Sequence, residues 1–281
     1  MKRWLPLLAF WACTPSFQDQ SVVRDLRVLA VQAEPPEAQY DDQGVDDVQV
    51  RVLALDPSHP PGPQSMVVTL CGPTDSRRCD TGPSFSLGQQ PLSTTLVVPS
   101  AALEAAVAND DLGGFGGLRV QFSLSIDDGD PARAVFASKV LLYSKRGSNP
   151  TPNHNPLLTG MHLTNEGVDG GTLQPGEMLH LPIGVKIGLR PLLADGARET
   201  YQTTDLRGNV VQLTEQPQYS FFTKPGAEFD SETADEPLDG VAPPDGLTRI
   251  DSLVPGSGTM WIVVRDGRGG ESWISFPWTT D

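Results

Sequence analysis

The sequence predicts an all-β protein with two antiparallel β-sandwich domains in tandem, after a signal peptide and a short tether. Three observations predict this class. Short runs with strand character recur at intervals of about 8–12 residues. The 28 glycines and 26 prolines supply the tight turns that such strands need. No helical pattern alternates with the strands, as an α/β fold would require.

The first domain is predicted over residues 26–143, and its clearest strand is Leu118–Ile126. The five apolar residues of this strand fall on one face and the four polar residues on the other. That alternation is typical of a half-buried antiparallel strand. A turn at 127–131 then reverses the chain into the next strand. Ser100 is expected to cap one short helix, Ala101–Ala108.

Residues 144–156 separate the two halves. They contain three prolines and no apolar residue, so they are predicted to be a semi-rigid inter-domain linker. The second domain, 157–281, repeats the strand pattern and ends in a hairpin that turns at 266–270. Residues 228–252 are expected to form a long acidic loop. Both halves follow the same plan, which indicates two related domains without a recognisable sequence repeat.

The first 13 residues have the organisation of an export signal. A cationic start, Met1–Arg3, precedes the apolar stretch Trp4–Trp11, and Ala12 then places a small residue before Cys13. This resembles the lipobox of bacterial lipoproteins, in which the cysteine thiol is acylated. The match is imperfect, because Phe10 stands where Leu is usual and the bulky Trp11 stands where a small residue is usual. We predict a signal peptide over residues 1–12 and a lipidated tether over residues 13–25.

Acylation of Cys13 would hold the chain on a lipid bilayer, since each buried methylene contributes about 0.8 kcal/mol. The predicted location is the outer membrane or the cell surface, because Thr14, rather than Asp, follows the cysteine. One alternative is an ordinary signal cleaved nearby, with Cys13 incidental and the product periplasmic or secreted. The other is a cytoplasmic protein. The sequence has no apolar run of the roughly 18–20 residues that span a bilayer.

Cys71 and Cys79 are predicted to form a local disulfide. The turn-rich segment between them, Gly72–Arg78, brings its ends together easily, and export implies an oxidising compartment. A disulfide that closes so small a loop would stabilise the folded protein by about 2–3 kcal/mol at most. A two-cysteine metal site is the rival interpretation, but the nearest histidine, His59, has no suitable spacing.

The formal net charge of the chain is −15. Without residues 1–12, which include Lys2 and Arg3, 18 basic residues stand against 35 acidic ones, a net charge of −17. Such a surface repels phosphate backbones and anionic headgroups, so we predict no nucleic-acid partner.

Motifs for catalysis are missing. Ser257 lacks the Gly-x-Ser-x-Gly spacing of a nucleophile elbow, and the four histidines form no His-Glu-x-x-His pair. The glycine-rich stretch 113–117 has no lysine to reach a phosphate. The sequence therefore predicts a protein without enzymatic activity or cofactor.

Two groups of residues remain as binding candidates. Asp127, Asp128 and Asp130 crowd one turn, and Ca²⁺ prefers such oxygen ligands, although the spacing is not that of an EF-hand and Asp-Gly is also good turn chemistry. All the tryptophans after the signal lie in the last 21 residues, and exposed aromatic rings stack on sugars. A tryptophan on a central strand more often packs between the sheets. These residues are Trp261, Trp273 and Trp278.

A family resemblance is carried by three segments: Leu26–Val31 with Ala33–Glu37, the linker Asn153–Pro156, and Val263–Gly270. They resemble a group of uncharacterised bacterial surface lipoproteins with immunoglobulin-like domains. The resemblance implies immunoglobulin-like sandwiches and a surface location, but it implies no catalytic or binding residue.

The sequence thus predicts a membrane-anchored, non-catalytic envelope lipoprotein that acts in protein interaction or scaffolding. The alternative is a carbohydrate- or peptidoglycan-binding surface module. The partner, an envelope protein or glycan, is not identified by any motif.

Overall fold

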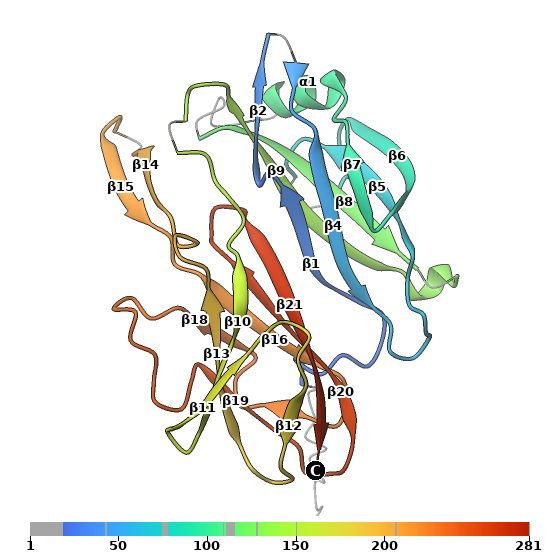
Figure 1. The fold of residues 1–281 in the computed structure, drawn as a ribbon. Helices are drawn as coiled ribbons and strands as arrows, with labels where there is room; N and C mark the ends of the chain where they lie inside the picture. Colours follow the sequence, from blue (N-terminus) through green and yellow to red (C-terminus); the bar gives the residue numbers. More distant parts are fainter. Residues whose placement is uncertain are drawn as a thin grey trace, which may run out of the picture.

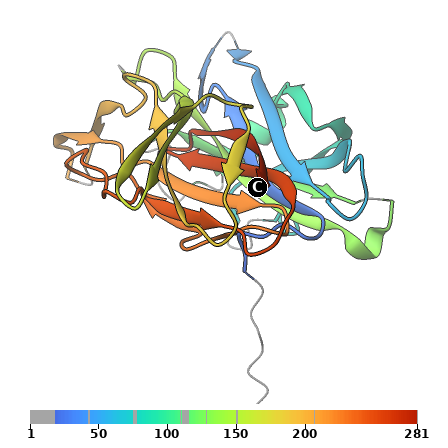
Figure 2. The same cartoon turned by 60° about the horizontal axis from the view of Figure 1, so that its bottom comes forward.

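A computed structural model describes residues 19–42, 44–74, 78–108, 110, 116–127, 129–149, 151–205 and 207–280. Over these ranges the chain forms two β-sandwiches that lie side by side (Figures 1 and 2). The predicted signal peptide 1–12 and the predicted lipidation site Cys13 lie outside the described residues. None of the helices in the described ranges is long and apolar enough to cross a bilayer.

The first domain consists of two facing sheets and a connecting helix. The helix is α1 (Ser100–Ala108), and a single 3-10 turn, η1 (Pro131–Arg133), precedes the last strand. The smaller sheet runs in the spatial order β1 (Arg27–Glu34), β4 (Val48–Leu55), β7 (Ser93–Leu96). The larger sheet runs in the order β3 (Gly44–Val45), β2 (Glu37–Asp41), β9 (Val135–Lys145), β8 (Leu118–Ile126), β5 (Ser65–Cys71), β6 (Ser84–Pro91).

The second domain is built in the same way, with an added hairpin. One sheet runs in the order β11 (Val168–Leu173), β10 (Leu158–Asn165), β13 (Ile187–Leu193), β19 (Thr248–Asp251), β17 (Glu228–Phe229). The other runs β12 (Leu179–Leu181), β21 (Glu271–Thr280), β20 (Ser257–Arg265), β16 (Gln218–Thr223), β18 (Thr233–Asp235). The hairpin of β14 (Thr200–Thr204) and β15 (Val210–Thr214) belongs to neither sheet and projects beside the first domain (Figure 1).

The two domains share one topology. In each domain the first strand lies in one sheet, and a following strand crosses to the other sheet. There it pairs in parallel with the last strand of the domain, β2 with β9 and β12 with β21. The matching sheets have the orders β2-β9-β8-β5-β6 and β12-β21-β20-β16-β18. Two packed sheets with this strand order form an immunoglobulin-like sandwich, which confirms the predicted fold class.

Each sandwich encloses its own apolar core. In the first domain, β8 buries Val120, Phe122 and Leu124 on the face that the sequence predicts. In the second, Phe221 of β16 and Ile262 of β20 are completely buried. Large apolar side chains contribute about 1.5–3 kcal/mol each when fully buried, so the alternating strands account for most of the cohesion within each domain.

The predicted acidic loop over residues 228–252 is wrong in part. The segment contains β17, β18 and β19, which complete both sheets of the second domain. Phe229 and Ile250 anchor it because both side chains are buried in the core. Strands of two to four residues are too short to show alternation in the sequence, which explains why they were missed.

Candidate functional site

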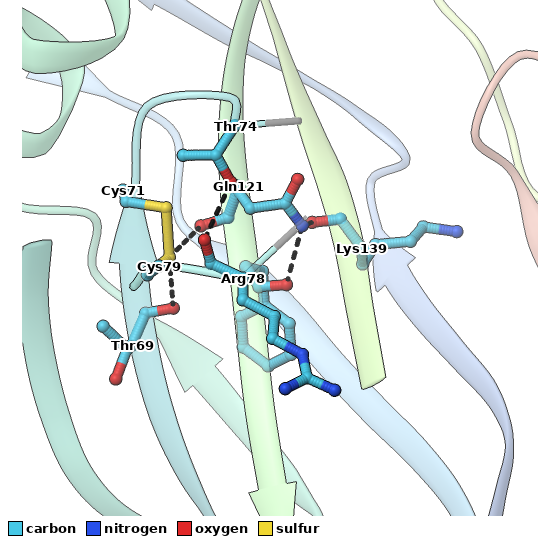
Figure 3. Close-up of a disulfide and its surroundings, with 8 residues drawn as sticks. Thr69, Cys71, Thr74, Arg78, Cys79, Gln121 and Lys139 are labelled. Atoms are coloured by element: carbon cyan, nitrogen blue, oxygen red, sulfur yellow. Dashed lines mark hydrogen bonds between the residues drawn. A yellow bond between two sulfur atoms is a disulfide. The ribbon is translucent and has the colours of Figure 1, made fainter. Parts of the chain in front are cut away.

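The predicted disulfide between Cys71 and Cys79 is confirmed, with Cα atoms 5.5 Å apart (Figure 3). Cys71 ends β5, and the disulfide holds Cys79 beside the sheet. The Sγ atom of Cys79 lies 3.7 Å from the carbonyl oxygen of Thr69 and 3.8 Å from that of Gln121. Gln121, a polar residue of β8, is buried. The disulfide therefore fixes Cys79 beside β5 and β8.

The tryptophan residues do not form an exposed platform. Trp278 is 1% exposed and lies in the core of the second domain, and Trp261 is 7% exposed and packs against the first domain. Trp273 is half-buried, with the guanidinium of Arg51 5.4 Å from the centre of its ring. This corrects the sugar-stacking hypothesis for Trp261 and Trp278, because Trp278 points into the core and the first domain covers the face of β20 that carries Trp261.

Two of the aspartates considered for Ca²⁺, Asp127 and Asp130, stabilise turns. Oδ1 of Asp127 accepts a hydrogen bond from the amide of Gly129 (3.0 Å), and Oδ1 of Asp130 accepts one from the amide of Ala132 (3.0 Å). Asp128 lies outside the described residues. Among the described residues, no group of three or more His, Cys, Asp or Glu side chains is placed to hold a metal ion.

The most elaborate polar structure of the described chain lies where the two domains meet. The turn between β20 and β21, residues 266–270, points into this junction. Oδ1 of Asp266 accepts hydrogen bonds from the amides of Arg268 (2.7 Å) and Gly270 (2.9 Å), and Oδ2 accepts one from Asn153 Nδ2 (2.9 Å). A Cβ atom on Gly270 would lie 2.0 Å from Asp266 Oδ2, so only glycine fits. Burial raises the pKa of the Asp266 carboxyl.

Arg268 is the centre of the junction. Its Nη1 donates to Glu199 Oε2 (3.2 Å) and Glu215 Oε1 (3.0 Å), and its Nη2 lies 3.5 Å from Glu37 Oε2 of the first domain. The guanidinium stacks on Tyr201 at 3.9 Å from the ring centre. The Arg268 side chain is only 12% exposed. A planar cation with several donors is suited to bridging three carboxylates in this way.

The segment between the domains is hydrogen-bonded to both of them. The amide of Asn153 donates to Glu37 Oε2 (3.1 Å), and Asn155 Nδ2 donates to the carbonyl oxygen of Ala33 (2.7 Å). On the side of the second domain, Oδ1 of Asn155 accepts from the amide of Glu271 (2.8 Å). Buried polar contacts in both directions fix the orientation of one domain relative to the other.

A second ionic cluster lies beside β1 and β21, which run next to each other in Figure 1. Glu271 contacts Lys139 Nζ (3.2 Å) and Arg265 Nη2 (2.7 Å), and the same Arg265 atom donates to the carbonyl oxygen of Leu29 (3.1 Å). The amide of Val31 donates to Glu271 Oε2 (3.3 Å). These groups line a cavity of about 550 Å³ between the domains.

The chain segment before β1 adds an apolar contact to the junction. Thr223, the last residue of β16, donates its amide to the carbonyl of Ser21 and accepts from the amide of Val23, both at 2.8 Å. Val23 then packs with Leu29 and Trp261 in a small buried cluster. The start of the described chain is thus bound to the second domain before the chain enters the first.

A larger cleft of about 720 Å³ lies between the first domain and the hairpin of β14 and β15. One wall comes from the ends of β2 and β9, and the other from β14. Arg268 and Tyr201 belong to its lining.

Sequence analysis did not single out the junction as a site, but it contained a signal. The three segments that carry the family resemblance meet there: Asn155 contacts Ala33, Asn153 contacts Asp266, and Arg265 Nη2 donates to the carbonyl oxygen of Leu29. The resemblance shared by these three segments was the signal.

A scan of protein-family models finds no match to this sequence, and a search of curated proteins finds none. Among solved structures, the two tandem V-type regions of VCBP3, a v-region-containing chitin binding protein, are similar with a TM-score of 0.32. Identity is 11%, and the match covers 90% of this chain and 100% of that one. The N-terminal Ig1-2 module of the Drosophila receptor protein tyrosine phosphatase DLAR gives a TM-score of 0.23 at 10% identity, covering 92% and 100%. At these scores the likenesses carry no argument, and the fold assignment rests on strand order.

The Glu215 carboxyl gives the junction a pH dependence. Burial raises its pKa above the ordinary value, and the nearby Asp266 acts in the same direction. A raised folded-state pKa means that the contribution of Glu215 to stability is complete below the ordinary carboxyl pKa and is lost as the pH rises through the folded value. Relative to Glu215→Gln, the wild-type free energy of unfolding is therefore expected to fall from pH 4 upwards. Urea unfolding of both proteins across this range tests it, and a pH-independent difference would contradict it.

Proposed function

We propose that this chain is a lipid-anchored, non-catalytic interaction protein of the bacterial envelope, held on the outer membrane or cell surface through Cys13. The order of its parts supports the proposal: an export signal that ends in Ala12-Cys13 is followed almost at once by a body of two joined domains. Acyl chains on Cys13 would supply the membrane affinity, and the domains would supply the binding surface.

The contacts at the start of the two-domain body also support this proposal. The contacts of Ser21 and Val23 with Thr223 begin eight residues after Cys13. Eight residues span at most about 28 Å when fully extended. A lipid on Cys13 would therefore keep the body close to the bilayer surface, with both domains presented as one unit.

Histidines of the described chain take part in ionic contacts between its elements. Three of them face a carboxylate: His59 faces Asp56 at 3.2 Å, His154 faces Glu199 at 2.6 Å, and His162 faces Asp169 at 3.1 Å. The Asp56 and Glu199 carboxylates also contact Arg133 and Arg268, so these pairs belong to ionic networks that join strands and loops.

Substitution of Cys13 by serine tests the anchor. When expressed in a Gram-negative host, the wild-type protein is expected in the membrane fraction, and Cys13→Ser in the soluble fraction, because serine cannot be acylated by the lipoprotein pathway. The double variant Cys71→Ser/Cys79→Ser is the matched control and is expected to stay with the membrane. Wild-type protein in the soluble fraction, or Cys13→Ser in the membrane fraction, would contradict the proposal.

A further inference from the structure

The cleft beside the hairpin has the chemistry of a ligand site that the sequence did not indicate. Its volume of about 720 Å³ lies within the range of small-molecule sites, roughly 300–1,000 Å³. Six of the fifteen lining residues carry a neutral amide or aliphatic hydroxyl group that can donate or accept hydrogen bonds. They are Ser144, Ser148, Asn149, Gln202, Thr203 and Thr204.

The charged residues of the lining are largely compensated. Glu37 and Arg268 lie 3.5 Å apart, and Arg268 is also bound to Glu199 and Glu215. Lys145 contributes one further positive charge at the rim. The cleft offers few uncompensated charges to pair with a highly charged ligand. A ligand with many hydroxyl groups, in contrast, could form hydrogen bonds with side chains on both walls.

One hydroxyl group at the wall of the cleft is buried without a hydrogen-bond partner. Ser144 is 6% exposed and lines the cleft, yet its Oγ has no hydrogen-bond partner within the described part of the chain. A buried hydroxyl without a partner costs about 1–3 kcal/mol, so such groups call for an explanation. A ligand hydroxyl at this position would supply the missing bond.

Two tyrosines add aromatic surface to the same cleft. Tyr201 and Tyr40 both line it and are half-buried, and Tyr40 also packs against the core of the first domain. The stack on Arg268 fixes the Tyr201 ring in position. Gly117 packs closely on β9 within the first-domain wall, because a Cβ atom there would lie 2.9 Å from Leu142 Cδ1. Fixed aromatic rings offer an apolar face beside hydroxyl partners, which is the combination that a sugar ring presents in return.

We infer that this cleft binds an oligosaccharide, whose rings contact Tyr201 and Tyr40 and whose hydroxyl groups bond to Ser144 and to the threonines of β14. The site lies in the body of the protein, and the inference does not depend on the anchor. The inferred glycan site consists of residues other than the tryptophans.

An extended peptide is the competing ligand, because β14 pairs with β15 on one side only. On its other side, the amide of Gln202 already donates to Thr151 Oγ1 at 3.4 Å. A peptide strand added to β14 would have to displace this bond, and the five residues of β14 leave only a short edge. The cleft thus favours a ligand bound through side chains.

The test uses the full-length chain, purified in detergent, on an array of neutral, acidic and amino-sugar oligosaccharides, followed by calorimetric titration of the glycans that bind. Tyr201→Ala is expected to weaken binding at least tenfold. Ser144→Ala and Thr204→Val are expected to weaken it about three- to tenfold, since each removes one hydrogen bond of about 0.5–1.5 kcal/mol. Gln212→Ala, an exposed position on β15 outside the cleft, is the control and is expected to leave binding unchanged.

Ser144→Ala removes a hydroxyl that has no partner, and Thr204→Val keeps the side-chain shape, so neither variant should disturb folding. A glycan whose binding weakens in all three cleft variants and not in the control supports the inference. Absence of any glycan binding at millimolar concentration would overturn it, as would binding that the cleft variants leave unchanged. Binding of an extended peptide in place of glycans, abolished by the same variants, would also overturn it.

Discussion

Replacement of Arg268 by alanine is expected to lower the free energy of unfolding by about 3–5 kcal/mol, because it removes the cation from a group of buried carboxylates. The side chains of Glu37 and Glu215 are 4% and 1% exposed, so both carboxylates depend on the guanidinium for charge compensation. The stack on Tyr201 is lost as well. Urea unfolding followed by tryptophan fluorescence measures the loss, since Trp261 lies at the same junction.

The matched control is Arg249→Ala. Arg249 also pairs with carboxylates, Asp230 at 2.7 Å and Asp245 at 3.9 Å, but its side chain is 44% exposed. Ion pairs of this kind contribute about 0–1 kcal/mol. If Arg268→Ala costs no more stability than Arg249→Ala, the junction is not held by the buried network.

Trp278→Ala is expected to lower the free energy of unfolding by about 3–5 kcal/mol, because a large core side chain leaves a cavity behind. Its indole Nε1 donates to Thr223 Oγ1 at 3.0 Å. Glycines make room for the ring: a Cβ atom on Gly258 would lie 2.6 Å from the indole, and one on Gly226 would lie 3.0 Å from it. The same unfolding experiment measures the effect.

Trp273→Ala is the control for this variant. Trp273 lies on the same strand, but it is half-buried and contacts Arg51 by a cation–π interaction. The expected loss is about 0.5–1 kcal/mol from that contact, together with the modest area that the ring buries. Equal losses for Trp273→Ala and Trp278→Ala would contradict the placement of Trp278 in the core.

Local patterns were sufficient to predict the sandwich class. The alternation over Leu118–Ile126 and the Asp-Gly turn chemistry are properties of short segments, and a short segment shows them whatever the rest of the chain does. The disulfide between Cys71 and Cys79 was predictable for the same reason, because the two cysteines are only eight residues apart.

The junction could not be predicted in this way, because its contacts join residues far apart in the sequence. Glu37 and Arg268 are separated by more than two hundred positions, and nothing local indicates that a turn arginine will be buried. Its carboxylate partners come from both domains and from the hairpin. Charged residues usually lie on the surface, so the sequence alone favours solvent exposure for each of them.

The tryptophans show how one pattern admits two interpretations. Trp261, Trp273 and Trp278 lie close together in the sequence, and a row of aromatic residues suits either a core or a sugar platform. Parts of the chain distant in sequence determine their environments. Glycines surround Trp278, and β1 of the first domain lies beside Trp261. The tyrosines of the cleft gave no signal, because Tyr40 and Tyr201 come together only through the domain arrangement.

Attachment of the two-domain body to a membrane through Cys13 is tested most directly by the intact mass of the detergent-extracted protein, before and after reduction. The mass is expected to equal that of the chain starting at Cys13 plus its acyl groups, and reduction should add two hydrogen atoms at the Cys71–Cys79 disulfide. An unacylated mass, from a chain that starts at another residue and is recovered in the soluble fraction, would contradict the anchor.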